Sequence, residues 1–397
     1  MRFSPRIGSI PASATLAVAA RARELKAKGE PVIDLSVGEP DFPTPDHIAQ
    51  AGIRAIEEHK TRYTPAAGLP ELRAAFAGWL GREYGLQYKP SATIVSCGAK
   101  HSIYNALAAV ALEGDEVIVV HPYWVSYPAQ VAAVGAKAVI VKTRERTGFK
   151  LTPDQLRLAI TDRTRALILN TPCNPTGAVY SAEELRGLAR VLAGTSVVVI
   201  FDEIYSKLVF GKQAHVNLVA VAPELRDQTV IINGASKAFA MTGWRIGLAA
   251  GPEPLITVMV NFQSHTTSNP CTISQYACLA ALTGDQKPVE EMRLEFERRG
   301  RRLRELLLEI PGITCAAADG AFYLFPRISA YLGKTIAGKR IASALDLSSL
   351  LLEEAKVATV AGTEFGDDEY LRLSYAIDIR ALEEAAGRLK SFLAQAR

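Results

Sequence analysis

The 14 residues from Gly234 to Gly247 read Gly-Ala-Ser-Lys-Ala-Phe-Ala-Met-Thr-Gly-Trp-Arg-Ile-Gly, and the rest of the chain is best interpreted from them. They follow an apolar run, Thr229 to Ile232, that is typical of a β-strand. Small residues surround Lys237, and Arg245 lies further along the same segment. A lysine in such a site can form an imine with an aldehyde, and an arginine can bind a phosphate bidentately. The segment therefore predicts a site for a ligand that carries both groups.

A carboxylate follows a second predicted strand. The apolar run from Ser196 to Phe201 is typical of a buried parallel strand, and Asp202 comes at its carboxyl end, where open α/β sheets bind ligands. Pyridoxal 5′-phosphate (PLP) has an aldehyde, a phosphate and a ring nitrogen that requires an acid. A carboxylate there keeps the nitrogen protonated, so that the ring can accept electrons when the substrate loses its α proton. We expect Tyr205 to donate a hydrogen bond to the 3-oxygen of the cofactor.

A turn that opens a helix offers a second phosphate contact. The run Ile94 to Cys97 predicts a short strand, and Gly98, Ala99 and Lys100 lead into a helical pattern from Ile103 to Leu112. The first amides of a helix have no partner within the helix, and the positive end of the helix dipole lies behind them. We therefore expect this turn to bind the phosphate together with Arg245.

With these residues in place, the chain resembles the fold-type I PLP enzymes and, among them, the class I aminotransferases, a group that includes bacterial aspartate aminotransferase. The resemblance covers nearly the whole chain. It rests on further segments in the order of that family, which are Leu35–Phe42, Tyr63–Gly68, Pro122–Pro128, Asn170–Gly177 and Tyr370–Ala376.

The resemblance implies a substrate site. Arg372 and the backbone N–H of Gly38 would bind the α-carboxylate of the amino acid. Trp124 would stack on the cofactor ring and Asn174 would bind its 3-oxygen, and both would also contact the substrate. Tyr63 would reach the phosphate of the neighbouring subunit, so that a homodimer completes each site.

The resemblance also implies the catalytic residue. Lys237 would hold the cofactor as a Schiff base and, once released, would move the proton between the substrate Cα and the cofactor. Many relatives have a serine three residues before this lysine, where this chain has Gly234. Ser236 is then the local hydroxyl expected to bind the phosphate.

The resemblance leaves side-chain specificity open. Animal and enteric aspartate enzymes bind the second carboxylate with an arginine at the position of Ser264, and nearer bacterial relatives use a lysine at the position of Pro11. Aspartate and 2-oxoglutarate are therefore the default substrates. Two alternative functions remain: an aminotransferase for aromatic or other neutral amino acids, and a PLP-dependent Cβ lyase. A noncatalytic PLP-binding regulator would need a DNA-binding extension. A nicotinamide dehydrogenase would need Gly-x-Gly-x-x-Gly after a strand, which is absent.

Each residue also has a simpler interpretation. A single lysine, aspartate or arginine at a strand end is usually solvated or paired at the surface. Trp124 and Tyr205 are typical core residues, and Asn174 before a proline is common in turns. The order of the segments along the chain favours the functional interpretation.

Length and pattern predict the architecture. The chain has 397 residues, too many for one compact core. Strand-like runs alternate with helical patterns up to about residue 290, which predicts an α/β fold with a mainly parallel sheet wrapped by helices. A smaller α+β domain follows, with a long helix from Val289 to Leu308 and short strands at Ile313–Cys315 and Phe322–Phe325. We expect an N-terminal arm that joins the small domain (1–45), a large PLP-binding domain (46–290) and a small C-terminal domain (291–397).

Composition excludes several classes of protein. The net charge is only +4, and no basic cluster with interleaved aromatics indicates nucleic-acid binding. The basic stretch Arg298–Arg302 is expected on the solvated face of a helix. No apolar run is long enough for a membrane span or a signal peptide. Five scattered cysteines predict neither disulfides nor a metal site, and the chain is expected to be cytoplasmic.

Overall fold

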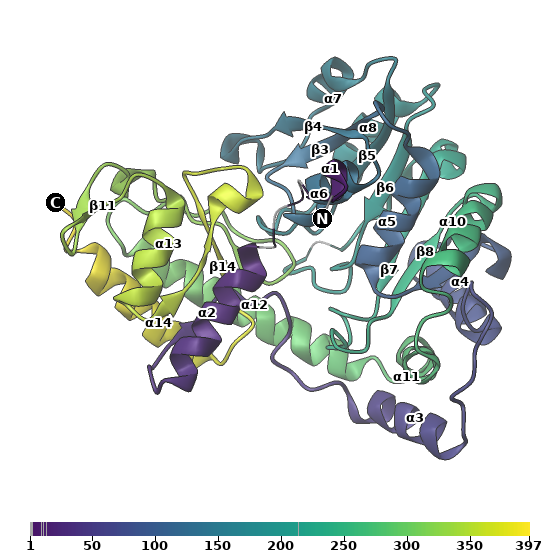
Figure 1. Ribbon diagram of the computed structural model, residues 1–397, viewed down its shortest axis with the longest axis horizontal. Helices are drawn as coiled ribbons and strands as arrows, with labels where there is room; N and C mark the ends of the chain where they lie inside the picture. The colour runs from purple at the N-terminus through teal and green to yellow at the C-terminus, as the bar shows by residue number, and fades with distance from the viewer. Residues whose placement is uncertain (1–2, 9, 11, 13, 213) are drawn as a thin grey trace.

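A seven-stranded sheet forms the centre of the larger body of the molecule (Figure 1), a computed structural model that describes residues 3–8, 10, 12, 14–212 and 214–397. Its spatial order is β2-β8-β7-β6-β5-β3-β4. The strands are β2 (Thr93–Ser96), β3 (Glu116–His121), β4 (Lys137–Lys142), β5 (Thr164–Asn170), β6 (Val198–Asp202), β7 (Thr229–Gly234) and β8 (Gly247–Ala250). Only β8 runs antiparallel to its neighbours. The prediction of a mainly parallel α/β sheet is confirmed.

Helices cover both faces of this sheet because its strands are apolar on both sides. Ile200 packs with residues of α5 and α10, whereas its neighbours Val199 and Phe201 pack with residues of α7 and α8 on the opposite face. The helices of this body are α3 (Asp46–Glu57), α4 (Pro70–Tyr84), α5 (Ala99–Val110), α6 (Ser126–Ala133), α7 (Pro153–Ala159), α8 (Ala182–Leu192), α9 (Leu218–Val221), α10 (Glu253–Thr266) and α11 (Thr272–Thr283).

The smaller body combines the C-terminal elements with the beginning of the chain. Its elements are α2 (Ala14–Ala27), β1 (Ile33–Asp34), α12 (Lys287–Leu308), β9 (Tyr323–Leu324), β10 (Thr335–Ile336), β11 (Lys339–Arg340), α13 (Ala344–Glu353), β12 (Val357–Ala358), β13 (Val360–Ala361), β14 (Leu371–Ser374) and α14 (Ile379–Leu393). The short helix α1 (Pro5–Gly8) lies against α6 of the larger body. β1 pairs in parallel with β12, and β14 lies between β13 and β9.

The long helix α12 connects the two bodies (Figure 1). It begins at Lys287, so the expected boundary at residue 290 falls inside it, and the proposed domain division stays a prediction. One hydrophobic cluster joins Leu35 and Tyr205 to the C-terminal core. The N-terminal segment and the residues after Asp202 therefore meet the smaller body where the two bodies approach each other.

Two local predictions were wrong. Arg299 is buried rather than solvated, because its guanidinium donates to both carboxylate oxygens of Asp41, at 2.8 and 2.9 Å, and to Glu295 at 2.8 Å. The run Ile313–Cys315 forms no strand and makes a single bridge, between Thr314 and Arg327. Both outcomes depend on partners distant in sequence.

No helix in the described part of the chain is both long and apolar enough to cross a lipid bilayer. The five cysteines are all free thiols, and Cys97, Cys173, Cys278 and Cys315 are at least partly shielded from solvent.

Candidate active site

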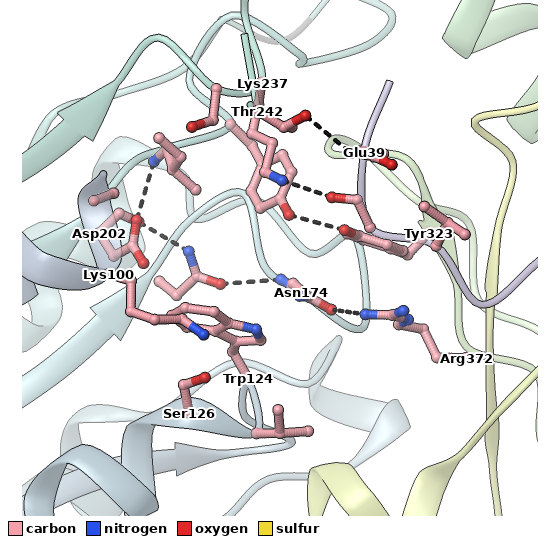
Figure 2. Close-up of a pocket in the computed structure, with 18 of the residues that line it drawn as sticks. Glu39, Lys100, Trp124, Ser126, Asn174, Asp202, Lys237, Thr242, Tyr323 and Arg372 are labelled. Atoms are coloured by element: carbon pink, nitrogen blue, oxygen red, sulfur yellow. Dashed lines mark hydrogen bonds between the residues drawn. The ribbon is translucent and has the colours of Figure 1, made fainter. Parts of the chain in front are cut away.

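A cavity of about 390 Å³ lies at the carboxyl ends of β5 and β6, where the two bodies meet (Figure 2). It brings together most of the predicted site residues, although they come from distant parts of the sequence. Those that line it are Gly38, Ala99, Lys100, Trp124, Asn174, Asp202, Tyr205, Ser236, Lys237, Arg245 and Arg372.

Lys237 lies in the turn that follows β7, and its Nζ donates to the Gly38 carbonyl at 2.6 Å. Burial lowers the pKa of Lys237 to about 8; the positive charges of Arg245 and Arg372 act in the same direction, and the negative charge of Glu39 acts against them. The neutral amine, which is the nucleophilic and basic form, is therefore available closer to neutral pH than for an ordinary lysine.

Asp202 is the last residue of β6 and is buried. Its carboxylate accepts hydrogen bonds from the Tyr127 hydroxyl at 2.6 Å and from the Ile204 backbone N–H at 3.1 Å. Burial raises the pKa of Asp202 to about 6, against the effect of these two donors. The carboxylate is thus prepared to share a proton with a basic ring nitrogen in the cavity.

A chain of hydrogen bonds connects Asp202 with Arg372, as the dashed lines of Figure 2 show. The side-chain amide of Asn170 donates to the Asp202 carbonyl at 3.0 Å, and its oxygen accepts from the Asn174 backbone N–H at 3.0 Å. The Asn174 oxygen accepts from Arg372 Nη1 at 3.2 Å. The strand ends of the large body and the arginine of β14 are therefore held at fixed positions across the cavity.

Arg372 is buried and has no carboxylate partner among the described residues. Its Nη2 donates to the Ser36 carbonyl at 2.5 Å, and its guanidinium lies 4.5 Å from the centre of the Tyr323 ring. Burial lowers the pKa of Arg372, and its buried Nε has no hydrogen-bond partner among the described residues. A buried guanidinium with a free N–H is suited to bind a carboxylate that enters the cavity.

The other end of the cavity has the features of an anion site. Gly98 caps α5 with a φ of 88°, and a Cβ at this position would lie 2.5 Å from Arg245 Nη2. Arg245 therefore packs directly on the turn before the helix, which only glycine allows. The first amides of α5, those of Ala99 and Lys100, have no acceptor within the helix. Backbone donors and a guanidinium thus converge at one point, beside the Ser236 side chain.

Trp124 and Tyr205 form apolar walls of the cavity. The Trp124 ring contacts Tyr127 edge-on, with centroids 5.4 Å apart, and the Lys100 ammonium lies 4.8 Å from the centre of the Trp124 indole. The Tyr205 hydroxyl is hydrogen-bonded to that of Tyr323 at 3.0 Å. The proposed contact of Tyr205 with a cofactor oxygen stays a prediction.

Three positions lie apart from the cavity or cannot be placed. Tyr63 is 91% exposed and does not line the cavity within this subunit. Ser264 is exposed on α10, where its hydroxyl donates to the Asn261 carbonyl at 2.7 Å. Pro11 lies outside the described residues. Neither Tyr63 nor Ser264 contributes to the site of this chain by itself.

Sequence reasoning missed several residues that line the cavity. Tyr127 supports Asp202, Tyr323 covers Arg372, and Thr242 donates to Glu39 at 2.8 Å. Arg23 of α2 also lines the cavity, with no ion pair or hydrogen bond to any described residue. Tyr127 lies in the segment Pro122–Pro128, which the resemblance already marked. Arg23 lies in a basic helix with no motif, so its own sequence gave no indication of a role.

Comparison with known proteins identifies the family. The model of the family "aminotransferase class I and II" matches residues 30–389. The chain belongs to the class I and II aminotransferase family. It is 49% identical to an aspartate aminotransferase of Geobacillus stearothermophilus, over 99% of both chains, and 46% identical to an aspartate/prephenate aminotransferase of Cereibacter sphaeroides, over 99% of this chain and 98% of the relative.

Solved structures of this family have the same fold. An aspartate aminotransferase from Rhizobium meliloti aligns over 100% of both chains with a TM-score of 0.96 and 41% identity. One from Thermus thermophilus with maleate aligns over 99% of this chain and 100% of its own, with a TM-score of 0.91 and 41% identity. The chain is therefore an aminotransferase of fold type I, as predicted.

A metal site was not expected from the sequence. Within the ranges that the structure describes, histidine, cysteine and acidic side chains form no group of three that could bind a metal ion.

Replacing Asp202 tests the electrostatics of the cavity. Because the folded-state pKa of about 6 exceeds the ordinary value of 3.8, Asp202 stabilises the cofactor-free protein at low pH, and this stabilisation is lost as pH rises towards 6. The unfolding free energy of the wild type, relative to Asp202→Asn, should fall by about 2 kcal/mol between about pH 4.5 and about pH 7. Urea unfolding across this range measures it, and parallel pH curves for the two proteins would contradict the raised pKa.

Proposed function

We propose that this protein is a PLP-dependent aminotransferase that moves the amino group of L-aspartate to 2-oxoglutarate in two half-reactions. The observation that supports it most is the position of Lys237, whose amine lies in one cavity with Asp202, Arg245 and Arg372. Relatives named aspartate aminotransferase, at 43–49% identity, support the donor.

The residues present fit PLP. The turn at Gly98, the Ser236 side chain and Arg245 would bind the phosphate, and the Asp202 carboxylate would pair with the ring nitrogen. Asn174 and Tyr205 would bind the 3-oxygen, and Trp124 would cover one face of the ring. When bound, PLP supplies an aldehyde that takes the amino group and a ring that accepts the electron pair released at Cα.

Lys237 carries out the proton transfer. Its amine, with a pKa near 8, removes the proton from the substrate Cα, and the resulting ammonium returns a proton in the later step. The Gly38 carbonyl, which accepts a hydrogen bond from Nζ at 2.6 Å, holds the amine at the centre of the cavity when it is free. Trp124 and Tyr205 exclude water from this region, which favours the neutral amine.

Arg372 and Gly38 orient the substrate. Arg372, which lines the cavity and has no carboxylate partner among the described residues, would bind the α-carboxylate that all amino acids share. Asn174 is bonded to Arg372 and therefore positions the guanidinium. This contact selects amino acids as a class and not a particular side chain.

Two further cations are candidates for binding the second carboxylate of the substrate. Arg23 and Lys100 line the cavity, and neither has an acidic partner among the described residues. Burial and the nearby positive charge of Arg245 lower the pKa of Lys100. We propose that Arg23 and Lys100 attract the distal carboxylate. This role agrees with the Thermus thermophilus structure, whose ligand, maleate, is a dicarboxylate.

We also propose that the protein works as a cytoplasmic homodimer. The exposed Tyr63 ring supports a contact with a second subunit, whose phosphate site it would complete. The five free cysteines support a reducing compartment.

Replacing Lys237 tests the proposed reaction. Lys237→Ala removes the amine that holds the cofactor and moves the proton, so transamination should fall by about 10³-fold or more while PLP still binds noncovalently. Turnover with aspartate and 2-oxoglutarate and PLP retention on gel filtration measure the two effects. Lys137→Ala, on the exposed strand β4, is the matched control. Turnover like that of the wild type in Lys237→Ala would refute the assignment.

Replacing the two free cations tests the donor. Arg23→Gln and Lys100→Gln should each raise the KM for aspartate about 10-fold or more and leave the KM for alanine, which lacks a second carboxylate, within about twofold. Lys26→Gln, also on α2 but outside the cavity, is the control. If the ratio of the KM for aspartate to the KM for alanine is unchanged in both variants, the basis for a dicarboxylate donor is removed.

Prephenate, tried as an amino acceptor, would show whether this protein has the second activity that the names of some relatives give.

A further inference from the structure

A second carboxylate, that of Glu203, lies directly after Asp202 and is fully buried. Its Oε2 is 2.9 Å from His215 Nε2 and accepts from Asn217 Nδ2 at 2.8 Å, and its Oε1 accepts from Asn233 Nδ2 at 3.0 Å. No lysine or arginine of the described chain forms an ion pair with it. None of these contacts takes part in the reaction proposed above.

His215 lies in an aromatic environment. Its Nδ1 is buried and has no hydrogen-bond partner among the described residues, and its ring centroid lies 5.8 Å from that of Tyr84 and 6.3 Å from that of Phe201. A carboxylate oxygen can only accept a hydrogen bond, so His215 Nε2 carries the proton of the bond to Glu203.

Glu203 is therefore a buried carboxyl group bonded to the side chains of His215, Asn217 and Asn233. The Tyr84 hydroxyl also faces it, and the charge of Glu203 helps to raise the pKa of Tyr84, after the larger effect of burial. Its negative charge stays uncompensated by any full positive charge in direct contact. Burying such a charge costs free energy, which hydrogen bonds offset only in part.

The contacts of Glu203 also fix the backbone around Asp202. The Glu203 N–H donates to the Ile232 carbonyl of β7 at 3.0 Å. Asn233 at the end of β7 also reaches the Ser206 hydroxyl, at 3.3 Å, and Asn217 caps α9 by accepting from the Val219 N–H. These hydrogen bonds therefore tie the ends of β6 and β7 and the start of α9 to one side chain, immediately behind the cavity.

The groups that face Asp202 act in opposite directions. The Tyr127 hydroxyl from α6, the Ile204 amide and the charge of Lys237 favour its ionised form, whereas burial and the negative charge of Glu203 favour its protonated form. Glu203 is thus the one acidic neighbour that increases the affinity of this site for a positive charge or a proton, within the described residues.

We propose that Glu203 is a positioning residue that holds Asp202 in place and, through its buried negative charge, strengthens the attraction of Asp202 for the protonated nitrogen of a bound heterocycle. Two negative charges then stabilise one positive ring nitrogen. Glu203 does not line the cavity, so its charge acts through Asp202 and without contact with the ligand. The role for a bound ring rests on the proposed function, whereas its effect on Asp202 exists without any cofactor.

The test is made on the cofactor-free protein, so that its outcome does not depend on the proposed reaction. Infrared spectra of protein labelled with ¹³C-aspartate, with the Asp202 band assigned from Asp202→Asn, give the pH at which Asp202 is half protonated. Glu203→Gln, which removes the charge at constant size, should lower this pH by about one unit. His215→Gln keeps the charge and a side-chain amide donor, and should leave it within about 0.3 units.

Three results would overturn the proposal. The first is an unchanged Asp202 titration in folded Glu203→Gln. The second is an equal shift of the Asp202 titration in Glu203→Gln and His215→Gln, which would indicate that Asp202 moves and not that a charge is lost. The third is a protonated Glu203 in the wild type. The protonation of Glu203 is measured by infrared spectroscopy of ¹³C-glutamate-labelled wild-type protein at neutral pH, so no variant has to fold. The expected spectrum has carboxylate bands and no band of a buried carboxylic acid. Loss of transamination in Lys237→Ala tests the reaction separately.

Discussion

The site depends on the alignment of two neighbouring strands. In the parallel pair of β5 and β6, Asn170 lies directly opposite Asp202, so both side chains reach the same edge of the sheet. Asn170 bonds the Asp202 backbone on one side and the Asn174 backbone on the other. If one strand shifted by one residue in this register, the side chains of Asn170 and Asp202 would point to opposite faces of the sheet. The ring-binding acid and the carboxylate-binding arginine would then no longer face a common cavity.

Charge is distributed unevenly along the cavity, and this determines what it can bind. Arg245 and the start of α5 form a positive end, and Arg372 lies at the other end, with Lys237 between them. The only acidic side chains of the described lining are Asp202 and Glu39, and Glu39 is engaged by Thr242. The cavity therefore favours ligands with several negative groups. Burial, and to a smaller extent the nearby Arg245 and Arg372, lowers the pKa of Lys237.

Much of the fold and site could be predicted because local patterns carry the signals. The apolar runs before Asp202 and Lys237 gave the strands β6 and β7, and the turn at Gly98 gave the helix start. What could not be predicted depends on partners that are remote in the chain. Arg299 is buried with Asp41 as a bidentate partner from the start of the chain, and the partners of Glu203 come from two separate segments, His215–Asn217 and the end of β7. Arg23 enters the cavity because β1 pairs with β12 and carries α2 to this place, which no pattern in the helix itself indicates.

The most direct measurement of the central claim is the near-visible absorption spectrum of the protein loaded with PLP, recorded before and after addition of aspartate without any amino acceptor. The account predicts that the band of the resting protein is replaced by that of pyridoxamine phosphate, and that 2-oxoglutarate restores it. If the band does not change with aspartate or glutamate, or if no band forms when PLP is added, the arrangement of Lys237, Asp202 and Arg372 does not perform this amino transfer.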